Sequence, residues 1–280
     1  MNRDTAVAPR EWVGHTQTIF DQVSHNLARR MAATLGEAAP ESGAALPPLW
    51  HWAYFQDPVA PSALGADGHP ARGRFLPPAE GRNRMWAGGR LQFLHPLVVG
   101  EDARCVSTIV SVEEKTGRSG ALLFVTVRHD YEQRGRLAVR EEQDIVYREP
   151  SPPRTADPAP LPQAEWSEAV VPTSTLLFRY SAATFNGHRI HYDWPYATQE
   201  EGYAGLVVHG PLIATLLLAA FRRAHPHLQP THFSYRGVRP LIAPMPFVVA
   251  GRMIGEGMAQ CWAANDDGAV QHGEVRFVAP

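Results

Sequence analysis

The chain has 280 residues, of which 44% are hydrophobic and 19% are charged, a composition typical of a soluble globular protein. Its 26 basic and 28 acidic residues nearly cancel to a formal net charge of -2, which argues against a non-specific nucleic-acid binder and a polybasic membrane-surface protein. The longest strongly apolar run, Leu212 to Phe221, is about half as long as a membrane-spanning helix.

The first half of the sequence predicts one helix followed by long strands. Apolar residues recur at helical spacing between Thr16 and Leu35, which predicts an amphipathic helix over that range. The segments that follow alternate polar and apolar residues and are separated by turn residues at 115–120 and 132–135. They predict long antiparallel strands over 90–112, 121–131 and 137–148.

A proline-rich segment divides the chain near its midpoint. Six prolines fall between Glu149 and Pro162, and proline at this density prevents both a helix and a central strand. We therefore expect an extended linker over 149–168. It separates an N-terminal unit, 1–148, from a C-terminal unit, 169–280.

The second half repeats the order of helix and strands. The segment from Gly210 to Arg223 is apolar nearly all round, which predicts a buried helix with Pro211 in its first turn. Turn residues 266–268 separate the last two strands. Strands are predicted over 233–238, 247–256, 259–264 and 270–278.

Short matches in the same order indicate that the two halves are copies of one unit. Residues 32–35 (AATL) resemble 182–185 (AATF), and Pro48-Leu49 and Pro211-Leu212 each open an apolar segment. Each unit would then be one buried helix wrapped by an antiparallel sheet, an α+β arrangement. The two sheets could pair edge to edge and so protect their exposed edges.

Polar residues are densest at the start of the second half. One predicted loop carries Asn186, His188, His191 and Asp193 within eight residues. His209 and Gly210 follow at the start of the predicted buried helix, where free backbone N–H groups and the helix dipole favour negative charge. Such donors would stabilise a thioester oxyanion, and a nearby imidazole could move a proton at neutral pH.

The pattern Asn186-x-x-x-x-His191, followed by Val208-His209-Gly210-Pro211, resembles the hydratase 2 motif of MaoC-like (R)-specific enoyl-CoA hydratases. The double hot-dog members are the most similar: type 2 3-hydroxyacyl-thioester dehydratases and mesaconyl-C4-CoA or itaconyl-CoA hydratases. Segment 84–90 (RMWAGGR) also resembles the N-terminal unit of that subgroup. The resemblance covers the chain from about Glu11 onward. It implies two hot-dog units and reversible syn addition of water across the α,β double bond of an acyl thioester.

The resemblance also implies catalytic roles. His191 matches the family's catalytic histidine, and the amide N–H of Gly210 matches the donor to the thioester carbonyl. Asn186 stands where most members have aspartate, and an amide cannot accept a proton. We therefore expect His191 alone to act as general base and acid, with Asn186 holding the attacking water and Asp193 orienting the imidazole.

Further contacts with an acyl-CoA are predicted from the positive charges. Arg84 lies in a proline- and glycine-rich segment expected to be exposed, where it could bind phosphates of CoA. Arg90 and Arg189 are candidates for the free carboxylate of a dicarboxylic acyl group such as mesaconyl-C4 or itaconyl, and His209 is a further candidate contact. Segment 36–41, the first-half counterpart of 186–191, has no Asn or His, so the first unit is expected to shape the acyl pocket without catalysing the reaction.

Three alternatives remain open: dehydration of a 3-hydroxyacyl-[acyl-carrier-protein] in fatty acid synthesis, a hot-dog thioesterase, and a non-catalytic binding module. His188 and His191 with Asp193 could form part of a metal site, but no third ligand is specified, and neither metal nor cofactor is expected. Two cysteines, Cys105 and Cys261, are expected to be free thiols. The sequence shows no signal peptide at its start, which predicts a cytoplasmic protein, or an organellar one if the chain is a mature form. Its oligomeric state is open, with a homodimer as the candidate.

Overall fold

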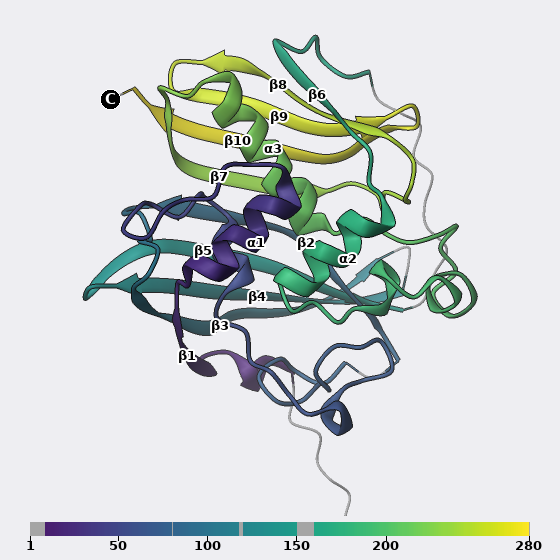
Figure 1. The fold of residues 1–280 in the computed structure, drawn as a ribbon. Helices are drawn as coiled ribbons and strands as arrows, with labels where there is room; N and C mark the ends of the chain where they lie inside the picture. Colours follow the sequence, from purple (N-terminus) through teal and green to yellow (C-terminus); the bar gives the residue numbers. More distant parts are fainter. Residues whose placement is uncertain (1–8, 80, 118–119, 150–159, 280) are drawn as a thin grey trace, which may run out of the picture.

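The computed structural model describes residues 9–79, 81–117, 120–149 and 160–279. These residues form a ten-stranded antiparallel sheet that curls around a central helix (Figure 1). The strands of the first half are β1 (Thr16–Gln22), β2 (Asn83–Phe93), β3 (Asp102–Gly117), β4 (Gly120–Gln133) and β5 (Arg136–Arg148). Those of the second half are β6 (Trp166–Val170), β7 (Gln229–Gly237), β8 (Phe247–Gly255), β9 (Met258–Asn265) and β10 (Gly268–Val278).

The strand order has internal symmetry. It runs β1-β3-β4-β5-β2 through the first half and β7-β10-β9-β8-β6 through the second. Each strand of one half therefore has a counterpart in the other, and the halves meet where β2 pairs with β7, with Arg90 opposite Ser234. This arrangement confirms the predicted edge-to-edge pairing and agrees with a duplicated unit.

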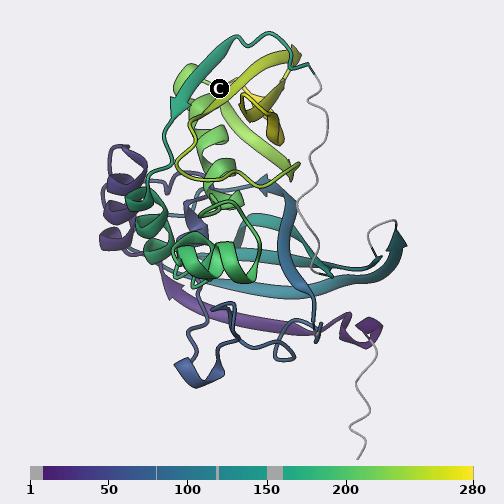
Figure 2. The same cartoon turned by 90° about the vertical axis from the view of Figure 1, so that its right-hand side faces the viewer.

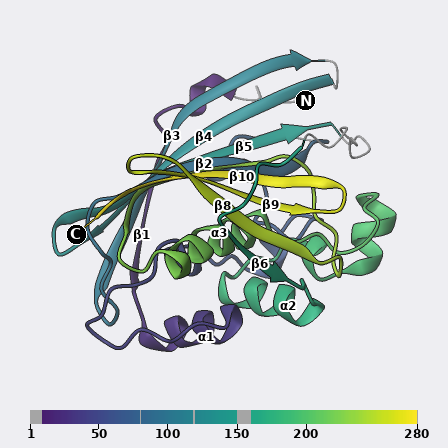
Figure 3. The ribbon, with the colours of Figure 1, turned by 90° about the horizontal axis from the view of Figure 1, so that it is seen from above.

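Helix α3 (Gly210–Ala224) is the predicted buried helix, and its residues 211–221 are all buried. It packs against strands β6 to β10, under the curl of the sheet (Figure 3). The first half has no helix of this length in the described residues. Its counterpart is the four-residue 3-10 turn η2 (Trp50–Ala53), so the expectation of a long buried helix in each half is wrong for the first.

The predicted helix over Thr16–Leu35 is wrong for its first part. Residues 16–22 form β1, an edge strand paired with β3, and the helix α1 spans only His25–Leu35. Ser24 caps the start of α1 by accepting a hydrogen bond from the Leu27 N–H. β-branched and aromatic residues favour the strand, but its inner positions include the polar Gln17 and Asp21 while Phe20 is exposed, so the sequence does not alternate polar and apolar residues.

The predicted strand over 90–112 is also wrong as one element. A loop over 94–101, which contains Pro96 and the left-handed Gly100 (φ 95°), divides it into β2 and β3. Strand β6 begins at Trp166, inside the range expected as linker, and half of that range, 150–159, lies outside the described residues. The remaining strand predictions agree with the structure to within a few residues.

Helix α2 (Ser174–Ala183) occupies in the second half the place that α1 has in the first. The two helices pack side by side (Figure 2). One hydrophobic cluster runs through both halves, from Met31 and Leu91 to Leu177 and Phe221. The halves therefore share a core. Over the described part of the chain, every helix is too short or too polar to cross a lipid bilayer.

Candidate active site

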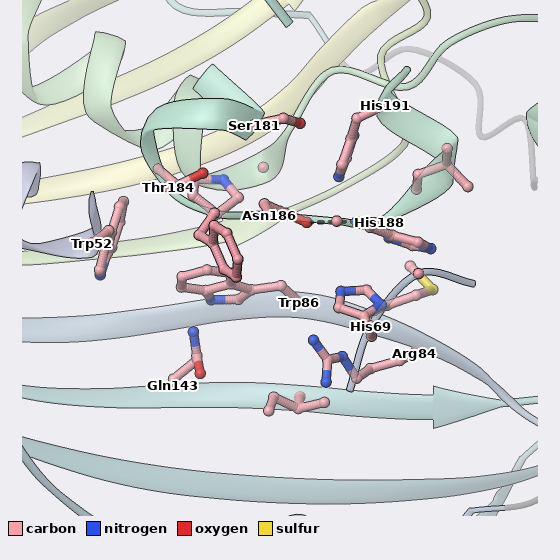
Figure 4. Close-up of a pocket in the computed structure, with 18 of the residues that line it drawn as sticks. Trp52, His69, Arg84, Trp86, Gln143, Ser181, Thr184, Asn186, His188 and His191 are labelled. Carbon is pink, nitrogen blue, oxygen red and sulfur yellow. Dashed lines mark hydrogen bonds between the residues drawn. The ribbon is translucent and has the colours of Figure 1, made fainter. Parts of the chain in front are cut away.

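A cavity of about 1190 Å³ lies where the two halves meet. Its walls come from strands β2 and β5, the loop over 56–76, the end of α2, the loop over 184–192, and the first residues of α3. Figure 4 shows Trp52 and Trp86 at one side and His69 with Arg84 at the other. The volume is large enough for a small acyl group together with part of its carrier arm.

The loop after α2 holds Asn186 in place through its own backbone. Phe185 takes a left-handed conformation (φ 51°), and the Asn186 N–H donates to the Ser181 carbonyl at 2.8 Å. The Asn186 Oδ1 atom accepts from the His188 N–H at 2.9 Å. Its carbonyl oxygen therefore shapes the loop, while its amide NH2 has no acceptor among the described residues and lines the cavity.

His191 is buried except for the face it turns to the cavity (Figure 4). Its Nδ1 atom lies 2.7 Å from the Val207 carbonyl oxygen. Because a carbonyl can only accept, Nδ1 carries the hydrogen and Nε2 of the neutral ring is a proton acceptor. Burial lowers the pKa of His191 to about 4, so the ring is neutral at pH 7.

His209 places this imidazole beside the start of α3. The two histidine rings are stacked with centroids 3.6 Å apart, and His209 is the residue before α3. The His209 ring is fully buried, with Nε2 at 2.8 Å from the Ser181 hydroxyl. It does not line the cavity, so the predicted substrate contact by His209 is wrong. His209 instead packs behind the His191 ring and supports it.

Gly210 brings the first backbone N–H of α3 to the cavity wall. The first N–H groups of a helix have no partner within the helix. An added Cβ at Gly210 would meet no atom within 4 Å, which shows that space is open in front of this residue. The Gln271 side chain donates to the Gly210 carbonyl at 3.3 Å, in the peptide that follows this N–H. His191 and Gly210 thus face one cavity.

Arg90, Arg189 and Asp193 lie outside this cavity. The Arg90 guanidinium is half exposed and bonds Glu142 at 2.7 Å and Asp144 at 2.8 Å. Its neighbours on the outer face of the sheet therefore already neutralise its charge, and the predicted carboxylate contact is wrong.

Arg189 and Asp193 form an ion pair with each other at 2.8 Å. The Asp193 Oδ1 atom accepts from the Tyr196 N–H at 3.2 Å. The Val207 carbonyl, and not Asp193, orients the His191 ring. Arg189 instead holds the loop over 65–69, since its backbone N–H donates to the Asp67 carbonyl and its Nη1 to the Ala66 carbonyl.

That loop brings first-half residues that the sequence analysis did not identify. Gly68 and Gly187 pass back to back, so closely that a Cβ on Gly187 would lie 2.6 Å from the Gly68 carbonyl oxygen. The contact sets His69 against His188, with ring centroids 4.3 Å apart. Asp67 Oδ2 lies 3.2 Å from His69 Nδ1. An Asp-x-His spacing was the only local signal, and its position depends on a contact between distant segments.

The ligand atoms of Asp67, His69 and His188 all lie within 4.8 Å of one another. A carboxylate and two neutral imidazoles are a possible metal-binding set. This set differs from the one considered in the sequence, because Asp193 is paired elsewhere. Asp67 is already engaged by the ring and backbone N–H of His69.

Arg84 is not exposed on a loop as predicted. It lies near the start of β2, half-buried, and lines the cavity beside His69 (Figure 4). At the other side of the cavity, the buried Glu141 accepts hydrogen bonds from Trp52 Nε1 at 3.0 Å and the Tyr131 hydroxyl at 3.1 Å. The two sides of the cavity therefore differ in charge.

The buried histidines make stability depend on pH. Burial lowers the pKa of His69 to about 4 and that of His188 to about 2, and it lowers the pKa of His209 well below its usual value. In the unfolded chain these rings take up protons near pH 6.5. Stability should be greatest above pH 6.5 and fall as the pH drops toward 4, by at most ~1.4 kcal/mol per pH unit for each ring. Urea titrations at pH 7.5, 6 and 5 measure this, and an unchanged midpoint would contradict it.

Comparison with known proteins places the chain in a family. The family model for hydroxyacyl-thioester dehydratase type 2 matches residues 49–243. The chain is similar to mesaconyl-C(4)-CoA hydratase of Chloroflexus aurantiacus, with 47% identity over 250 residues, covering 88% of this chain and 89% of that protein.

Two solved structures share the fold. A MaoC-like dehydratase from Phytophthora capsici matches 100% of this chain and 98% of its own, with a TM-score of 0.68 and 14% identity. A Mycobacterium tuberculosis protein described as a double hot-dog fold matches 95% of this chain and 96% of its own, with a TM-score of 0.59 and 14% identity. The predicted double hot-dog fold is confirmed, and the chain belongs to the hydroxyacyl-thioester dehydratase type 2 family, a MaoC-like family of hydro-lyases.

Proposed function

We propose that the protein hydrates a short dicarboxylic enoyl-CoA, with mesaconyl-C4-CoA as the first candidate substrate and itaconyl-CoA as the second. One observation carries the proposal: His191, whose Nδ1 is bonded to the Val207 carbonyl so that Nε2 is the proton acceptor, and Gly210, the first residue of α3, line the same cavity. A base and an oxyanion donor on one cavity suit addition of water to an enoyl thioester. The relative with 47% identity is named for this reaction on mesaconyl-C4-CoA.

In the proposed reaction on mesaconyl-C4-CoA, whose double bond is conjugated with the thioester, His191 Nε2 takes one proton from a water molecule that the Asn186 amide orients. The water oxygen forms a bond to Cβ, and the π electrons move toward Cα and the thioester oxygen. The Gly210 N–H and the N-terminus of α3 stabilise the negative charge on that oxygen. Protonated His191 then gives its proton to Cα, so that H and OH are added from one face and the imidazole returns to its neutral form.

The first half supplies walls to the cavity rather than the base and the oxyanion donor of this scheme. Trp52 and Trp86 pack edge to face with ring centroids 5.3 Å apart and line one side. His69 and Arg84 line another. These side chains support the proposal that the first half shapes the acyl pocket while His191 in the second half carries the chemistry.

An assay on purified protein tests the proposed function. Mesaconyl-C4-CoA, itaconyl-CoA and crotonyl-CoA are each incubated with enzyme while loss of the enoyl-thioester absorbance and release of free thiol are followed. Loss of absorbance without thiol supports hydration. Thiol release without hydration would indicate a thioesterase. No reaction with any of the three would point to a carrier-protein substrate or a binding module, and would refute the proposal.

A further inference from the structure

Arg84 is a cavity-facing cation with no anionic partner in the part of the chain that the structure describes. No carboxylate lies within ion-pair distance of its guanidinium there, and burial lowers its pKa. Its first neighbour is the Tyr147 hydroxyl, which interacts with the guanidinium but stays neutral because burial raises the pKa of Tyr147. The carboxylate that acts on Arg84 is Asp67, whose oxygen already bonds His69 at 3.2 Å and lies 4.0 Å from Arg72. The charge of Arg84 is therefore not neutralised by a neighbour.

Other arginines of the sheet differ from Arg84 in this respect. Arg90, on the same strand, is half exposed and yet bonds two carboxylates. Arg104 pairs with Glu132 at 2.6 Å, and Arg140 pairs with Asp130 at 2.7 Å. Of these four arginines, Arg84 is the least exposed to solvent, and it is the one without a carboxylate partner. Leaving a desolvated guanidinium without an anionic partner costs free energy, which a bound anion would recover.

The position of Arg84 relates it to the reacting atoms. It lies close enough to His69 and His188 to lower the pKa of both rings, and the His188 ring is 5.4 Å from that of His191 between centroids. In an enoyl-CoA with a carboxylate on Cβ, that carboxylate is one bond from the carbon that receives water. A cation that binds it must therefore line the same cavity as His191, and Arg84 does so from the wall beside His69.

The charge distribution of the cavity orients such a ligand. Glu141 is buried at the Trp52 side, where three neighbouring side chains hydrogen-bond it, and it would repel a substrate carboxylate. Arg84 lies at the other side in Figure 4. The same guanidinium disfavours a metal ion on Asp67, His69 and His188, because it would add a positive charge beside a cation.

We propose that Arg84 binds the free carboxylate of the acyl group and thereby selects dicarboxylic over monocarboxylic enoyl-CoA substrates. This rests on the proposed function and assigns a specificity residue to the first half. The planar guanidinium can hold a carboxylate through two parallel hydrogen bonds. Positioning the carboxylate also fixes Cβ relative to the water on Asn186 and His191.

The test compares Arg84→Gln with Arg90→Gln, a matched loss of one arginine on the same strand but outside the cavity. We expect R84Q to lower the ratio of kcat/KM for mesaconyl-C4-CoA to that for crotonyl-CoA by about 100-fold, the scale of a lost charge-assisted bond pair. R90Q should keep the wild-type ratio. Arg84→Lys, which keeps the charge, should restore part of the selectivity and covers the case in which R84Q does not fold.

Several outcomes would overturn the proposal. An unchanged ratio in R84Q, whether activity is kept or is lost equally with both substrates, would show that Arg84 does not bind the carboxylate. Loss of selectivity after chelator treatment of the wild type, restored by Zn²⁺, would assign the carboxylate to a metal at Asp67, His69 and His188 instead. A wild-type protein that hydrates neither substrate would refute the proposed function itself, which distinguishes the two failures.

Discussion

Replacement of His191 by alanine is expected to lower kcat by about two to four orders of magnitude, the usual loss for a removed acid–base group. The Val207 carbonyl fixes the hydrogen on Nδ1, so Nε2 is the acceptor on the cavity side. Asn186 cannot replace it, because an amide takes no proton at neutral pH. Initial rates of enoyl-thioester hydration at saturating substrate measure the change.

The matched control is His232→Ala, which removes an exposed histidine of β7 outside the cavity. It should keep wild-type turnover. Because the His191 ring also stacks on His209 at 3.6 Å, the thermal midpoint of H191A must be measured beside its activity. A folded H191A protein with full turnover would rule out His191 as the base.

Gly68→Ala is expected to reduce kcat/KM by about 10- to 100-fold, the order of loss that a displacement of about 1 Å produces at a catalytic site. A Cβ at this position would overlap the carbonyl oxygen of Gly187, and Gly68 has a positive φ of 84°. The Gly187 carbonyl oxygen is a backbone atom and the added Cβ is fixed to the backbone of residue 68, so no side-chain rotation relieves the overlap and the loop over 65–69 must move away from the loop that carries His188 and His191. Substrate titration of the purified variant measures the loss.

Gly73→Ala is the control for this substitution. Gly73 lies in the same segment with a φ of 85°, and an added Cβ there meets nothing within 4 Å. It therefore carries the same conformational cost without the collision. Equal activity of the two variants would show that contact between the loops does not matter. A loss confined to G68A would show that the first half positions the site.

The sequence alone predicted those elements whose signal lies within one short segment. Gly210 and Pro211 mark the start of α3, and the apolar run behind them identifies a buried helix. The resemblance of Asn186-x-x-x-x-His191 and Val208-His209-Gly210-Pro211 to the hydratase 2 motif predicted that this loop and the start of α3 belong to one site. Edge strand β1 was misassigned because its inner positions include the polar Gln17 and Asp21 and its outer face exposes Phe20, so the sequence shows no apolar face with a period of two.

The first-half wall of the cavity could not be predicted from the sequence. Residues 56–82 contain many prolines and glycines and no period, so their path is set by long-range contacts. The approach of Gly68 to Gly187 joins segments more than a hundred residues apart. Arg84 was expected on an exposed loop because it follows a glycine-rich stretch. The structure begins strand β2 one residue before it, at Asn83.

The hydrophobic cluster that runs through both halves has a thermodynamic consequence. Met31 and Leu91 on one side and Leu177 and Phe221 on the other exclude water together, and the β2–β7 ladder crosses the same boundary. Neither half can lose its packing without exposing apolar surface of the other. The two halves should therefore unfold as a single cooperative unit. A substitution that disrupts the packing of either half would then lower the stability of the whole enzyme.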